Sequence, residues 1–154
     1  MGRVFGFLVF FLLYFSAFSQ DVHRVVVDFR SGDIREFEGF LLKGLSSNIQ
    51  HYRDRLEELK VVVVIHGNGY RFFIKNLQKS PYSDEELMKR QKEFKERLEN
   101  LVKFYGVRFE ICSLGLKARG ISEDNIYDFV KPVYSALESL VNWQNRGYAY
   151  ILLQ

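Results

Sequence analysis

The fold is decided by the stretch KVVVVIHG, residues 60–67. Its five consecutive apolar residues do not alternate with polar ones, so a strand here would be buried on both of its faces. Such strands are typical of the centre of a parallel sheet, where helices cover both sides. We therefore expect this segment to be a central strand of a parallel sheet.

The residues before this stretch predict one strand and one long helix. HRVVVDF, residues 23–29, is rich in β-branched residues and predicts a strand, and the following SGD predicts a turn. Apolar side chains then recur at helical spacing, which predicts an amphipathic helix. The stripe comprises Phe37, Leu41, Leu45, Ile49, Tyr52, Leu56 and Leu59.

A second helix is predicted after the central strand, with a signal at each end. Ser83 is the predicted N-cap, and Glu86 three residues later would complete a capping box. Gly106 is the predicted end of the helix. Between them the apolar stripe comprises Leu87, Phe94, Leu98, Leu101 and Tyr105.

The rest of the chain continues the alternation of strands and helices. The predicted elements are a third strand at 107–112, short helical pieces at 113–120 and 122–129, a fourth strand that Pro132 opens, a helix at 136–145 and a strand at 147–153. This order predicts βαβ units with right-handed crossovers. We expect one α/β domain over residues 20–154: a three-layer α/β/α sandwich of flavodoxin-like size around a mainly parallel five-stranded sheet.

The first 19 residues have the pattern of a secretory signal peptide. Arg3 precedes an uncharged apolar run, and Ala17 and Ser19 occupy the −3 and −1 positions of a cut between Ser19 and Gln20. The apolar stretch from 4 to 18 is shorter than the ~20 residues that a spanning helix needs. We therefore expect a periplasmic or secreted protein; an uncleaved N-terminal membrane anchor is the alternative.

Charge and cysteine content exclude several classes of protein. The whole chain has 22 Lys and Arg against 19 Asp and Glu; without Arg3 the balance is 21 against 19. Such a small, interspersed excess gives no reason to expect a nucleic-acid partner. Because the chain has one cysteine, it is not a scaffold held by intramolecular disulfides, and its thiol is either buried and inert or reactive.

Cys112 closes the predicted third strand directly before a helical piece. Ligands of open α/β sheets bind beyond the carboxyl ends of the strands. A thiol at a helix start also lies near free N–H groups, which favour the nucleophilic thiolate. Lys117 and Arg119 could add positive potential. The alternative is a structural cysteine that packs as a small apolar residue.

His66 begins the motif HGNGY, residues 66–70, at the end of the central strand. It could act as an acid or base for Cys112 if their strands are neighbours, because adjacent strands are ~4.8 Å apart. A structural histidine is the alternative. The two glycines of the motif could admit a phosphate or a flavin, but they lack dinucleotide or Walker spacing, and a tight turn also explains them.

Other kinds of site have little support in the sequence. His23, His51 and His66 show no metal-ligand spacing, and no nucleophile elbow marks a serine hydrolase. We expect neither a metal nor an organic cofactor.

The stretch YGVRFEICSLGLKARGI, residues 105–121, resembles the segment around the reactive cysteine of the DsrE-type sulfur-relay family, which includes TusD-like carriers. VVVVIHGNG and the C-terminal NRGYAYILL resemble the exported DsrE-like branch. The resemblance implies a three-layer domain that forms homo-oligomers, as a trimer or hexamer. It also implies that Cys112 carries sulfur as a persulfide, and it matches His66 to a recurrent histidine of the branch.

These observations predict a periplasmic sulfur-transfer protein, a possible sulfurtransferase in which Cys112 accepts sulfur and His66 acts as acid or base. Its partners would be a sulfane-sulfur donor and an acceptor thiol on a protein or small molecule. A non-catalytic module of the same fold, which binds a small ligand or assembles with a partner while Cys112 only packs, is the second hypothesis.

Overall fold

Residues 20–154 are described by the computed structural model, and the predicted signal peptide, residues 1–19, lies outside the described residues. Five parallel strands form one sheet in the order β4-β3-β2-β1-β5. The strands are β1 (Val22–Phe29), β2 (Glu58–Ile65), β3 (Arg108–Cys112), β4 (Val130–Val133) and β5 (Ala149–Leu153). The predicted α/β fold is confirmed, and the sheet is parallel throughout.

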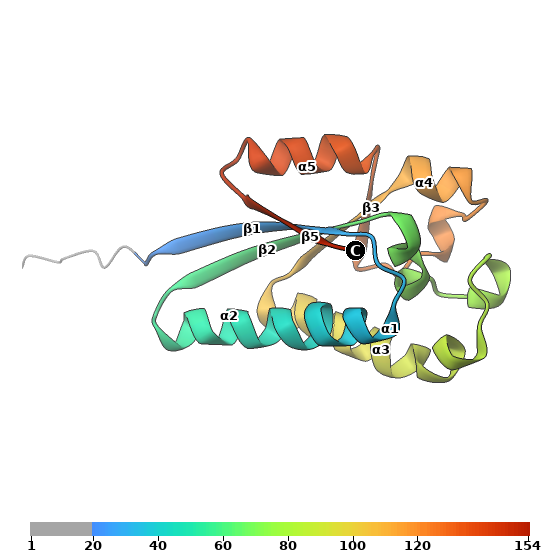
Figure 1. Ribbon diagram of the computed structural model, residues 1–154, viewed down its shortest axis with the longest axis horizontal. Coiled ribbons are helices and arrows are strands. Elements are labelled where there is room, and N and C mark those ends of the chain that lie inside the picture. Colours follow the sequence, from blue (N-terminus) through green and yellow to red (C-terminus); the bar gives the residue numbers. More distant parts are fainter. Residues whose placement is uncertain (1–19) are drawn as a thin grey trace, which may run out of the picture.

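Helices cover the sheet in two layers (Figure 1). One layer contains α1 (Ile34–Glu36), the π-helical η1 (Phe37–Gly44), α2 (Leu45–Asp54) and the long α3 (Glu85–Tyr105); the other contains α4 (Ser113–Ala118) and α5 (Ala136–Gln144). Short 3₁₀ segments, η2 (Gly67–Phe73), η3 (Leu77–Lys79) and η4 (Glu123–Asn125), connect the larger elements. The three central strands are thereby buried on both faces, as the apolar run of β2 requires.

The first helical segment differs from its prediction in winding and in length. It is a continuous helical run whose middle part, η1, is a π-helix. Its apolar residues Phe37, Leu41 and Leu45 are spaced four apart, a spacing that is compatible with the α-helix as well as with the wider turn of a π-helix. The run ends at Asp54, because Leu56 turns the chain with a φ of 61°. The prediction that Leu56 and Leu59 belong to this helix was therefore wrong.

Two further boundaries differ from the sequence predictions. The N-cap of α3 is Asp84 rather than Ser83, since the Asp84 carboxylate accepts a hydrogen bond from the backbone N–H of Leu87 at 2.7 Å. Strand β4 begins at Val130 rather than at Pro132. A proline inside this strand is tolerated because β4 lies at the edge of the sheet. Gly106 ends α3 in the left-handed conformation, with a φ of 70°, as predicted.

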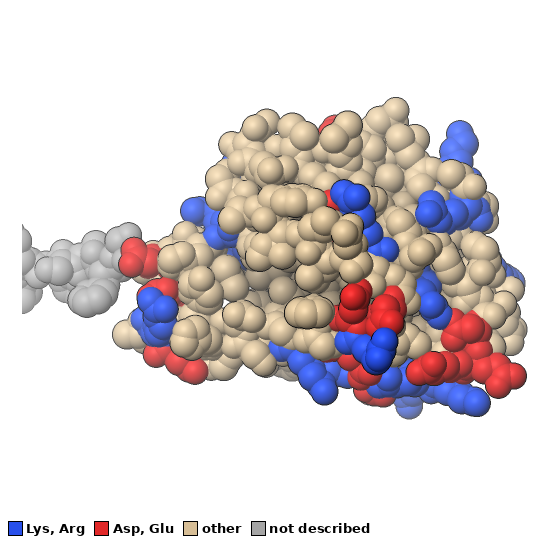
Figure 2. Space-filling model, in the orientation of Figure 1, with Lys and Arg blue, Asp and Glu red and all other residues tan. Residues whose placement is uncertain are grey.

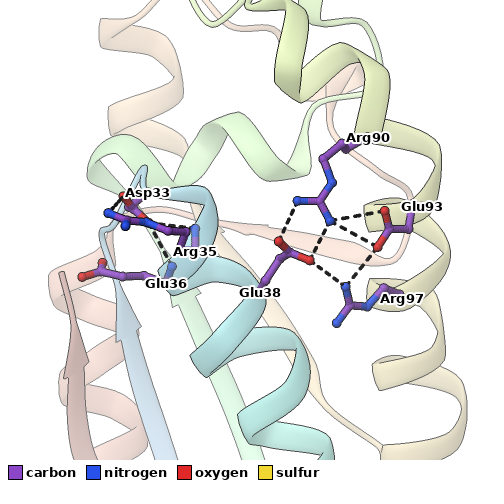
Figure 3. A network of polar contacts seen from close by, with 7 residues as sticks. All are labelled: Asp33, Arg35, Glu36, Glu38, Arg90, Glu93 and Arg97. Carbon is purple, nitrogen blue, oxygen red and sulfur yellow. Dashed lines mark hydrogen bonds and ion pairs between the residues drawn. The ribbon is translucent and has the colours of Figure 1, made fainter.

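An ion network joins η1 to α3 (Figure 3). Both carboxylate oxygens of Glu38 accept hydrogen bonds from Arg90, each at 2.6 Å, and Arg97 donates to the same group at 3.2 Å. The hydrogen bonds from Arg90 outweigh partial burial and lower the pKa of Glu38 from 4.5 to about 2. Bidentate pairs of this kind add geometric specificity as well as stabilising energy. The network therefore sets the position of α3 against η1.

We predict that Glu38→Gln lowers the free energy of unfolding at neutral pH by about 2 kcal/mol, since charged hydrogen bonds are lost. Because folding lowers the pKa of Glu38, its contribution is complete above the ordinary value of 4.5 and disappears as the pH falls towards about 2. Denaturant unfolding of both proteins across that range should show the difference shrinking. Glu99→Gln, which removes an exposed pair with Lys95, is the control and should cost about 0.5 kcal/mol or less. A difference that does not change with pH would contradict the assignment.

Candidate functional site

Cys112 is the last residue of β3 and the N-cap of α4. Its carbonyl oxygen accepts a hydrogen bond from the Tyr70 hydroxyl at 3.0 Å. The residue is buried, with 7% of its surface exposed. The strand end therefore places Cys112 at the edge of the sheet where ligands of open α/β sheets bind, with little of the residue exposed to solvent.

Tyr70 and Gly115 form one wall beside Cys112. Tyr70 is fully buried, and burial raises the pKa of its hydroxyl, which stays a neutral hydrogen-bond donor. A Cβ atom on Gly115 would overlap the Tyr70 hydroxyl. Only glycine at the third position of α4 therefore leaves room for the hydrogen bond from Tyr70 to Cys112.

The basic residues after Cys112 point to other partners. Arg119 donates to the Tyr82 hydroxyl at 2.9 Å and to the Gly115 carbonyl at 3.3 Å, and its guanidinium lies 5.0 Å from the centre of the Tyr70 ring. Lys117 is exposed. Arg119 thus stabilises the wall behind Cys112, and within residues 20–154 neither cation forms a hydrogen bond with Cys112 itself.

His66 follows β2 directly, and its neighbour is β3. Ile65 pairs with Ile111 in the parallel register, so His66 and Cys112 occupy the next facing positions. The hydrogen bond of His66, however, is made on the opposite side: Nε2 lies 2.5 Å from Oδ1 of Asp28 on β1. The structure therefore brings the strand ends of His66 and Cys112 together but engages one ring nitrogen with a third residue.

Asp28 is a buried carboxylate with three hydrogen-bond donors. It is fully inaccessible to solvent and contacts His66, the Arg30 guanidinium at 2.6 Å and the Tyr150 hydroxyl at 2.7 Å. Burial alone would raise the pKa of Asp28, but these hydrogen bonds outweigh it and hold the pKa well below its usual range. Since an ionised carboxylate only accepts hydrogen bonds, Nε2 of His66 carries a proton.

Asp28 and its partners Arg30 and Tyr150 were not among the predicted site residues. The available signal was an acidic residue within an otherwise apolar strand, VVVDF. Such a residue requires buried donors, because a buried carboxylate without them is strongly destabilising. Which donors meet it depends on β5 lying beside β1, and local sequence does not reveal that pairing.

A second buried carboxylate was missed for the same reason. Glu110 of β3 accepts hydrogen bonds from Ser139 at 2.6 Å, from the Trp143 indole at 3.0 Å and from Arg108 at 2.7 Å. Burial opposes these bonds, which nevertheless lower the pKa of Glu110. Two of the donors lie on α5, so Glu110 ties that helix to the sheet beside a surface hollow of about 340 Å³.

The glycines of the HGNGY motif are explained by packing within the chain. Gly67 has a φ of 60°, a conformation that favours glycine, and it lies close to Arg30. A Cβ atom on Gly69 would lie 2.8 Å from the Phe29 ring. Both positions meet the protein's own atoms, which supports the interpretation of the motif as a tight turn.

The residues that the structure describes form neither a cluster of metal-ligand side chains nor a membrane-spanning helix. Within residues 20–154 no three side chains of the His, Cys, Asp or Glu type converge as metal ligands. No helix in the same range has the length and apolar character needed to cross a membrane.

A family model, described as the DsrE/DsrF-like family, matches residues 24–153. The chain belongs to this family. No curated protein matches the chain. Among solved structures, the DsrE-family chain is similar to a protein of unknown function, MTH1491 from Methanobacterium thermoautotrophicum, with 27% identity and a TM-score of 0.60 over 85% of this chain and 99% of that one. Membership of the DsrE/DsrF-like family indicates sulfur relay at a general level.

We predict that Gly115→Ala destabilises the protein by about 1–3 kcal/mol, because the new methyl group forces Tyr70 away from Cys112. The same change should speed alkylation of Cys112 in the folded protein. Gly39→Ala is the matched control, since no atom lies within 4 Å of the added carbon. Denaturant unfolding and mass-resolved alkylation measure both effects. Equal stability of the two variants would show that the wall beside Cys112 is not closely packed.

Proposed function

We propose that this DsrE-like protein is an exported sulfur carrier that holds sulfane sulfur as a persulfide on Cys112. The observation that carries the proposal is the position of the only cysteine of the chain at the carboxyl end of β3, next to the carboxyl end of β2. The match to the DsrE/DsrF-like family over nearly all described residues supports it.

The connections on either side of this position diverge. After β2 the chain continues to α3, on the same face of the sheet as α2, whereas after β3 it enters α4 on the face that carries α5 (Figure 1). In open parallel sheets, ligands bind outside the carboxyl ends of the strands. Cys112 lies at the carboxyl end of β3, next to the end of β2, which favours a reactive role for this residue.

The proposed transfer needs no redox partner. The Cys112 thiolate attacks the sulfane sulfur of a donor; a new S–S bond forms, the donor's S–S bond breaks, and the donor leaves with the electron pair. A thiolate of the acceptor then attacks the outer sulfur, and Cys112 leaves as thiolate. Both steps are exchanges at sulfur, so the chemistry requires neither a metal nor an organic cofactor.

We predict that the protein gains the mass of one sulfur atom when it is incubated with polysulfide or thiosulfate, and that an added thiol removes this sulfur. Cys112→Ser should show no adduct because it lacks the nucleophile. Intact-protein mass spectrometry measures the change, with the donor-free protein as control. Failure of every sulfane donor to modify a protein whose Cys112 reacts with alkylating agents would contradict the proposal.

The second candidate is a binding or assembly module in which Cys112 only packs. The 7% exposure of this residue favours it, because inert cysteines are typically buried. Alkylation distinguishes the two functions: a reactive Cys112 is modified in the native protein, whereas a structural one is modified only after unfolding.

We further propose that residues 1–19 are a cleaved signal peptide and that the mature protein is a homo-oligomer, as a trimer or hexamer. Large apolar side chains are exposed around α5, and this part of the surface carries few charges (Figure 2). They are Leu114, Tyr134, Leu137 and Val141. Exposed apolar side chains that lie together are typical of protein–protein contact surfaces.

Mass spectrometry tests both parts of this proposal on protein expressed with its N-terminal segment. We predict a denatured mass that begins at Gln20 and a native mass of three or six chains. Leu137→Lys should reduce the native mass to that of fewer chains, because it introduces a charge into the contact. A full-length chain would instead support the membrane anchor, and a native mass of one chain would contradict assembly.

A further inference from the structure

Burial of the Asp28 carboxylate costs more free energy than burial of an apolar side chain at the same position would. Asp28 is buried on β1, which pairs with β2 on one side and with β5 on the other. A valine at this position could pack in the sheet without desolvation of a charge. Desolvation of an ion is costly even in a relaxed protein, and the hydrogen bonds of paired donors only offset that cost. A buried charge at the carboxyl end of a sheet is therefore a candidate for a functional role.

The oxygens of Asp28 are fully engaged, so the group cannot itself bind a ligand. Oδ1 faces Nε2 of His66 and Nε of Arg30, and Oδ2 receives Nη2 of Arg30 and the Tyr150 hydroxyl. What the carboxylate determines is the orientation of His66. One edge of that ring is held inside the protein, while 23% of the side chain stays accessible.

The second ring nitrogen of His66 is free for chemistry. No hydrogen-bond partner for Nδ1 is found among the side chains and backbone of residues 20–154. Paired residues on neighbouring parallel strands point to the same face of the sheet, and His66 and Cys112 follow the pair Ile65 and Ile111. His66 and Cys112 thus belong to the same face of the sheet, at the ends of adjacent strands.

We propose that Asp28 is a positioning residue that fixes His66 with its proton on Nε2 and presents Nδ1 as the acid and base for sulfur transfer at Cys112. The inference rests on the proposed function. Nδ1 accepts the proton of the Cys112 thiol as sulfur attacks the donor, and the adjacent Asp28 carboxylate balances the imidazolium charge. The new S–S bond forms, the donor's S–S bond breaks, and Nδ1 returns the proton to the departing thiolate.

A double-mutant cycle on the rate of persulfide formation tests this role. At neutral pH, His66→Gln should slow the reaction about 100-fold, within the range of general acid–base catalysis, and Asp28→Asn at least about tenfold. If Asp28 acts through His66, Asp28→Asn should cause no further loss in the His66→Gln background. Ser139→Ala, which removes a hydrogen bond to the other buried carboxylate on the same face, controls for structural loss and should react as fast as the unchanged protein.

The tautomer of His66 gives a second readout that does not depend on activity. Two-bond nitrogen–proton correlations should show neutral His66 protonated at Nε2 in the unchanged protein and a mixture of tautomers in Asp28→Asn. Protonation at Nδ1 in the unchanged protein would overturn the inference. Persulfide formation in both Asp28→Asn and His66→Gln at the rate of Ser139→Ala would also overturn the inference. The proposed function would stand in that case. Absence of any persulfide on the unchanged protein would overturn both.

Discussion

The structure depends on the burial of β1, β2 and β3 on both faces of one parallel sheet. Because these strands run in the same direction, all of their carboxyl ends lie at one edge, and the side chains that follow them are brought together. Asp28, His66 and Cys112 are far apart in the sequence but reach this edge on three adjacent strands. The site is therefore a direct consequence of the requirement to bury uninterrupted apolar strands.

Two carboxylates interrupt this apolar interior. Each determines how one element is placed against the sheet, a placement that hydrophobic packing alone would define less closely. Asp28 joins the edge strand β5 to the centre of the sheet through Tyr150, and Glu110 joins α5 to β3 through Ser139 and Trp143. Packing tolerates small sliding of elements, whereas a buried charge with fixed donors does not. The polar contacts thus define where the two C-terminal elements lie.

Much of this architecture could be predicted from the sequence, because apolar periodicity is a local property. The uninterrupted run of β2 indicated a central parallel strand, and Gly106 indicated the end of α3. The order of the strands could not be read in the same way, since it depends on contacts between distant segments. Asp28 was missed for this reason: its donors Arg30, His66 and Tyr150 are brought together only by the pairing of β1 with β2 and β5. The π-helical winding of η1 was also missed, because the four-residue spacing of its apolar side chains is equally that of an ordinary α-helix.

The proposed function places sulfur on Cys112, at the strand edge that it shares with His66. Because Cys112 is mostly buried, the direction in which its sulfur points decides whether a donor can reach it. A high-resolution crystal structure of the protein after exposure to polysulfide tests this most directly. We predict density for one additional sulfur on Cys112 Sγ, directed to the side of Nδ1 of His66. An unmodified sulfur enclosed by aliphatic side chains, with His66 turned away from it, would contradict the account.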